Sequence, residues 1–188
     1  MSKKIRAVYQ LKVSLRDIEP PVWRRMQVWE DTKLPQLHRI LQLSFNWEDY
    51  HLHDFVAGRR VYSVPDPDDA FNERKVIDEK SVPLNRIVDH VGDTFEYAYD
   101  FGDDWQHEIL LEAILLPDAE AFYPCCIAGG YADYLEALAD PEHEEHENLL
   151  AWRGPFDPEA FSPDTINASL NRTFRRRAAA SAIPKSIT

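Results

Sequence analysis

Residues 94–115 have the sequence TFEYAYDFGDDWQHEILLEAIL, which predicts two antiparallel strands joined by a tight turn. Alternate residues share one face: Phe95, Tyr97, Tyr99 and Phe101 before the turn, and Trp105, His107, Ile109, Leu111 and Ala113 after it. A period of two is typical of a strand with one buried face. Between the strands, Gly102 is expected to supply a positive φ, while neighbouring aspartates accept hydrogen bonds from backbone amides.

The segments before this hairpin predict more strands and one helix. Residues 5–15 alternate in the same way, and residues 22–29 resume after a proline-containing break, so the two are expected to pair antiparallel. Residues 50–64 predict a second hairpin, around Ala57 and Gly58. Residues 31–47 predict a helix capped by Asp31 or Thr32. Its apolar face comprises Leu34, Leu37, Ile40, Leu41 and Phe45.

The remaining segments complete the predicted fold. Residues 65–80 and 123–130 predict loops, and residues 82–93 predict a short helix closed by Gly92. Residues 131–140, 141–154 and 162–179 predict three helices. We therefore expect an α+β fold, an antiparallel meander sheet with helices packed on one face and a helical C-terminal third. One domain is expected over residues 1–170, followed by a basic helix end and tail over residues 171–188.

Composition indicates a globular protein. Hydrophobic residues make up 44% of the 188 residues, and no apolar run approaches the roughly 20 residues that span a bilayer. We therefore expect no membrane association. Cys125 and Cys126 are adjacent, a spacing at which a disulfide is strained, and there is no CxxC pair for zinc. They predict reduced thiols in a cytoplasmic protein.

The charge is unevenly distributed. The net charge is −12, but residues 1–25 and 171–188 are each basic, so the acidity lies between them. An acidic body repels phosphate backbones. Nucleic acid binding is therefore expected, if at all, only through the tail that contains Arg175, Arg176 and Arg177.

Two acidic and histidine-rich segments form the candidate site. The turn contributes Asp100, Asp103 and Asp104, with His107 just beyond it, and these four are the candidate catalytic residues. Carboxylates crowded in one turn repel each other, a cost that a cation, a basic partner or a substrate can offset. The second segment, HLHDF (51–55), alternates two histidines on one predicted strand face.

Those histidines predict a metal site if the two segments meet. The expected ligands of a divalent metal are His51, His53, His107 and Asp100, because imidazole and carboxylate donors suit such ions. The alternative is a set of histidines hydrogen-bonded to carboxylates at a polar sheet edge. The candidate binding residues are Arg24, Arg25 and Trp105. For the two arginines, an ion pair with the acidic body is favoured over an anion clamp.

Taken in order, these motifs resemble the plasmid pRiA4b ORF-3-like family. The resemblance covers Tyr9 to Leu170 and includes Trp-Arg-Arg, His-Leu-His and Asp-Phe-Gly-Asp-x-Trp-x-His. It implies an α+β fold in a bacterial protein of a plasmid or mobile element, without an established activity. Members are also labelled resolvase-like, but this chain lacks the features of serine recombinases. It also lacks a Pro-Pro-Glu-Asp segment that related sequences carry after the glycine-containing loop.

Two functions are therefore open, and the sequence does not decide whether the chain is an enzyme. The favoured one is a binding or accessory module, whose acidic sheet face holds a protein encoded by the same mobile element. The alternative is a metal-assisted hydrolase or nuclease, in which His51, His53, His107 and an aspartate hold the ion while a second aspartate activates water.

Overall fold

The structure is a computed structural model that describes residues 5–18, 22–65, 76–130, 141 and 162–181. In this part of the chain, eight strands form one sheet in the order β5-β4-β3-β6-β7-β1-β2-β8. The strands are β1 (Val8–Leu15), β2 (Trp23–Trp29), β3 (His53–Ala57), β4 (Arg60–Ser63), β5 (Val76–Asp78), β6 (Thr94–Tyr99), β7 (Trp105–Leu115) and β8 (Cys125–Gly130). The helices are α1 (Leu34–Phe45), α4 (Pro163–Ser181) and two 3-10 turns, η2 (Glu79–Ser81) and η3 (Leu84–Arg86).

The three predicted strand pairs are confirmed. β1 pairs antiparallel with β2, β3 with β4, and β6 with β7. The β3–β4 hairpin turns through two residues, Gly58 and Arg59, and Gly58 has a φ of 59°. Glycine at the first position of a two-residue turn matches the twist of the strands on either side.

The predicted meander is wrong, because the sheet is mixed and its order is not sequential. β4 and β5 are parallel, and β1 lies between β7 and β2. Alternation within a segment shows which face is buried, but it does not show which distant strand lies alongside. The register of β1 against β7, with Leu11 opposite Leu111, is therefore set by tertiary packing.

The predicted helical C-terminal third is also wrong. Residues 125–130, expected to be a loop, form β8 and pair antiparallel with β2. Beyond β8, the described chain contains one α-helix, α4. The helices expected within 131–154 fall, apart from Pro141, outside the described residues. Val76–Asp78, expected to be loop, forms β5, and the helix expected over 82–93 is reduced to η3.

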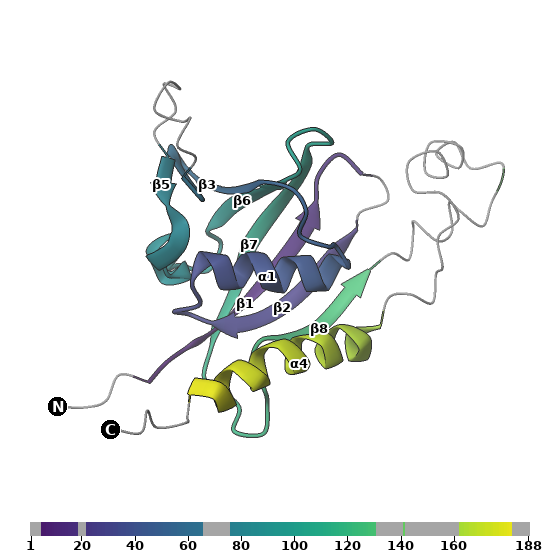
Figure 1. The fold of residues 1–188 in the computed structure, drawn as a ribbon. Helices are drawn as coiled ribbons and strands as arrows, with labels where there is room; N and C mark the ends of the chain where they lie inside the picture. Colours follow the sequence, from purple (N-terminus) through teal and green to yellow (C-terminus); the bar gives the residue numbers. More distant parts are fainter. Residues whose placement is uncertain (1–4, 19–21, 66–75, 131–140, 142–161, 182–188) are drawn as a thin grey trace, which may run out of the picture.

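The core lies between one face of the sheet and α1, which crosses the sheet over β1, β2 and β7 (Figure 1). All five residues of the predicted apolar face of α1 are buried. The expected cap is wrong. The helix begins after Lys33, and the Gln36 side chain accepts a hydrogen bond from the Lys33 amide at 3.2 Å. Asn46, with a φ of 57°, ends the helix.

The second helix, α4, runs beside β8 (Figure 1). Leu170 is fully buried there. The Asn167 side chain accepts a hydrogen bond from the Cys126 amide at 2.7 Å and donates one to the Cys126 carbonyl at 2.8 Å. Both cysteines are free thiols, and burial raises the pKa of Cys126 to about 11. No helix among the described residues is long and apolar enough to cross a membrane.

Replacement of Leu41 by alanine is expected to destabilise the fold by about 2–5 kcal/mol, because it leaves a cavity between α1 and the sheet. Leu41 is fully buried, whereas Leu116 is 76% exposed, so Leu116→Ala is the matched control and is expected to change stability little. Urea unfolding of both variants measures the difference. Equal losses would contradict the assignment of α1 as the principal cover of the sheet.

Candidate functional site

The turn between β6 and β7 is shaped by its aspartates. Asp100 and Asp104 have positive φ values of 57° and 56°, whereas Gly102 lies outside the left-handed region, so the expected role of Gly102 is wrong. The Asp100 carboxylate accepts a hydrogen bond from the Gly102 amide at 3.0 Å. Aspartate tolerates this backbone conformation because its short side chain can bond to the local backbone.

Of the predicted site residues, His51 and Asp100 are brought together. His51 Nδ1 lies 3.3 Å from Asp100 Oδ2. The Asp100 amide donates a hydrogen bond to the Leu52 carbonyl at 2.9 Å, and the Tyr50 amide donates one to the Tyr99 hydroxyl at 3.1 Å. Hydrogen bonds therefore hold residues 50–52, which precede β3, against the turn at an exposed end of the sheet.

His53 faces inward instead. It is buried, its Nε2 lies 3.1 Å from Glu79 Oε2, and its ring stacks on that of His38 at a centroid distance of 3.6 Å. His38 Nδ1 pairs with the Tyr97 hydroxyl at 2.8 Å, and His38 Nε2 with Asp49 Oδ1 at 2.7 Å. Burial lowers the pKa of His38, with the neighbouring His53 as the second cause.

Sequence reasoning missed His38 and Glu79 as partners of His53. His38 lies one position after Leu37 and three before Leu41, so the apolar face of α1 was a usable signal for its burial. Glu79 gave no such signal, because it lies in a polar segment and reaches His53 only through the fold.

His107 is fully buried in an aromatic environment. Its Nδ1 lies 3.1 Å from the Tyr97 carbonyl oxygen, so Nδ1 carries the proton and donates. Its Nε2 has no hydrogen-bond partner among the described residues. The rings of Phe45 and Trp47 lie 5.0 and 5.1 Å from its centroid. Burial lowers the pKa of His107 to about 4, so the imidazole is neutral at pH 7.

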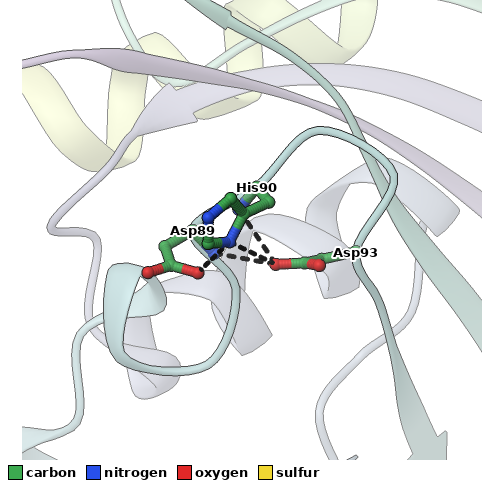
Figure 2. A group of neighbouring side chains, drawn as sticks. All are labelled: Asp89, His90 and Asp93. Carbon is green, nitrogen blue, oxygen red and sulfur yellow. Dashed lines mark hydrogen bonds and ion pairs between the residues drawn. The ribbon is translucent and has the colours of Figure 1, made fainter.

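The four predicted metal ligands do not form a close group. Within the described residues, the group whose donor atoms all lie within 4.8 Å of one another is Asp89, His90 and Asp93 (Figure 2), which contains none of the four. Asp93 Oδ2 accepts hydrogen bonds from the backbone amides of His90 and Asp89, at 2.9 and 3.0 Å. These two bonds hold the pKa of Asp93 below its usual range. They also close a local turn, which is why the three side chains lie close together.

The predicted binding residues are engaged within the fold. Arg25 donates two hydrogen bonds to Glu112, at 2.5 and 2.8 Å, which is the favoured ion pair and holds the pKa of Glu112 low. Arg24 is buried, and its Nε donates a hydrogen bond to the Ser44 carbonyl at 3.1 Å. Trp105 is half-buried, with its ring 5.9 Å from that of Trp47.

In the C-terminal helix, the guanidinium of Arg175 lies 4.6 Å from the Phe122 ring centroid. The side chains of Arg176 and Arg177 lie outside the described residues. The expected contact of this tail with nucleic acid therefore stays a prediction.

Most of the chain matches a known protein family. The family model described as plasmid pRiA4b ORF-3-like protein matches residues 7–165. The chain belongs to this family.

Two relatives extend the match. The uncharacterized protein y4hQ of Sinorhizobium fredii is 35% identical over 166 residues, which are 81% of this chain and 84% of the relative. The crystal structure of the protein of unknown function MM3350 from Methanosarcina mazei Go1 is 35% identical and has a TM-score of 0.65. That likeness covers 86% of this chain and 98% of MM3350. These matches show the family and its fold. The names of the relatives give no role to any site residue.

The burial of His107 predicts a pH-dependent stability. An unfolded histidine takes up a proton below about pH 6.5, while the folded one resists protonation. This histidine is therefore expected to cost about 1.4 kcal/mol of stability per pH unit as pH falls from 6.5 toward its folded pKa. Urea unfolding between pH 7 and pH 5 is expected to show a smaller loss for His107→Leu than for the wild type. Equal losses would contradict a neutral buried imidazole.

Proposed function

We propose that this protein is a binding or accessory module that holds a basic protein segment at the β6–β7 turn. One observation carries the proposal: exposed apolar side chains lie beside exposed carboxylates at this end of the sheet. Tyr50 is 79% exposed, Leu52 66% and Phe101 50%. Asp103 and Asp104 are exposed in the same turn.

The geometry suits recognition of a partner. Hydrogen bonds from Asp100 to Leu52 and from Tyr50 to Tyr99 hold the two segments together, so the apolar side chains are presented on a fixed backbone. Exposed aromatic and aliphatic residues surrounded by polar ones are typical of interaction sites, where a few anchors supply most of the binding energy. A preformed surface also lowers the entropy lost on binding.

Charge selects the kind of partner. The chain has a net charge of −12, and the turn adds carboxylates at the rim of the apolar patch. Complementary charge steers association and disfavours partners of like charge. The expected partner is therefore a lysine- or arginine-rich segment that also carries an apolar anchor, and membership of a plasmid family supports a partner encoded on the same element.

A metal-assisted hydrolase or nuclease has less support. Of the four expected ligands, His53 faces Glu79 inside the core and His107 is fully buried, which leaves His51 and Asp100 at the surface. Ligands of one ion must converge, and a site that contained all four would need β3 and β7 to repack.

A charge reversal tests the binding surface. A fluorescent peptide with alternating lysine, arginine and tryptophan serves as the probe, and fluorescence anisotropy measures its Kd. Asp103→Lys is expected to weaken binding about fivefold, because it replaces attraction by repulsion. Glu120→Lys makes the same change in net charge at another exposed site and is expected to weaken binding less. Equal losses would assign the binding to net charge alone and overturn the proposed site.

Metal titration tests the alternative. Thermal unfolding is expected to be unchanged when Mn²⁺, Zn²⁺ or EDTA is added, because a ligand stabilises a fold only if it binds the folded state. A rise in Tm with Mn²⁺ or Zn²⁺ that His51→Ala and Asp100→Asn both abolish would instead favour the metal-assisted enzyme.

A further inference from the structure

A cavity lies where the β3–β4 hairpin meets η3 and the start of β6. Its volume is about 370 Å³, a size common for small-molecule sites. Arg59 and Arg60 line it from the hairpin, and Arg86 lines it from η3. Segments far apart in the sequence thus bring three guanidinium-bearing residues to one hollow.

These arginines differ from others in the chain. Four arginines elsewhere in the fold meet carboxylates: Arg6 with Asp31, Arg16 with Glu96 and Glu108, Arg25 with Glu112, and Arg39 with Asp49. Within the described residues, Arg59, Arg60 and Arg86 form no ion pair. Among the described residues of this acidic chain, three arginines without an ion pair therefore lie together around one cavity.

The lining contains one carboxylate, which offsets one of the three arginine charges. Asp93 lines the cavity, but its Oδ2 already accepts hydrogen bonds from the backbone amides of Asp89 and His90 (Figure 2). The net formal charge of the lining side chains is therefore positive, three arginines against one aspartate.

We infer that this cavity binds a small organic phosphate. Guanidinium groups form paired, charge-assisted hydrogen bonds with phosphate oxygens, and Thr94 adds a hydroxyl to the lining. The cavity is larger than a phosphate group alone, and Tyr62 and Ile87 supply an aromatic and an aliphatic surface for the organic part. The phosphate lies toward the arginines, and the organic part lies against these two side chains.

This site is separate from the proposed protein-binding surface. β3 and β6 are antiparallel, with His53 opposite Tyr99 and Val56 opposite Glu96. The arginine-lined cavity therefore lies at the Ala57–Thr94 end of these strands, and the acidic turn lies at the opposite end. Either site can fail its test without affecting the other.

Isothermal titration calorimetry with AMP, ribose 5-phosphate, inorganic phosphate and adenosine tests the inference. At least one of the two organic phosphates is expected to bind more tightly than inorganic phosphate, and adenosine is expected not to bind. Arg86→Gln is expected to weaken binding of the organic phosphate about tenfold, because it removes a charge-assisted hydrogen bond. Arg86 is exposed, so this change leaves the core intact.

Arg172→Gln is the matched control, since Arg172 is an exposed arginine on α4, and it is expected to leave the Kd unchanged. Three results would overturn the inference. The first is that neither organic phosphate binds. The second is that inorganic phosphate binds as tightly as they do. The third is that Arg172→Gln weakens binding as much as Arg86→Gln does.

Discussion

The hydroxyl of Tyr97 joins α1 to the centre of the sheet, and the placement of the histidines depends on it. It accepts a hydrogen bond from Gln42 at 3.0 Å and pairs with His38 at 2.8 Å. Asp49 completes the network, since its amide donates to the Gln42 side chain at 3.0 Å. A buried polar network is favourable only when its members are satisfied, so these bonds admit few other positions of α1 on the sheet.

The histidines in and near this network differ in burial: His38 and His53 are buried, whereas His51 is exposed. His38 stacks on His53, and Glu79 Oε2 lies 3.1 Å from His53 Nε2, so His53, which resembles a metal ligand in the sequence, belongs to the core. His51, two residues before His53, lies at the surface beside Asp100. The two proposed sites, the turn and the arginine-lined cavity, lie at opposite ends of the same strands.

The sequence correctly predicted those strands and that helix in which buried side chains recur at a regular spacing of two or three to four residues. The alternation in β1, β6 and β7 and the apolar face of α1 are all found in the structure. β8 was missed because CCIAGG carries no alternation and becomes a strand only against β2. The pairing of His53 with Glu79 and the gathering of Arg59 with Arg86 depend on tertiary structure, which a single sequence does not display. At the turn, Asp100 took the conformation expected of a glycine because its carboxylate bonds to its own loop.

The side chain of Asn167 has a consequence for how copies of this protein meet. By both donating to and accepting from the backbone of Cys126, it imitates a residue of a neighbouring strand at the outer edge of the sheet. An uncovered edge offers unpaired amides and carbonyls to any extended chain, and proteins guard such edges against aggregation. The opposite edge, β5, is three residues long. At Cys126, a side chain thus takes the place of a paired strand, and the described strand at the other edge is short. Both features limit the backbone groups that these edges offer to a foreign strand.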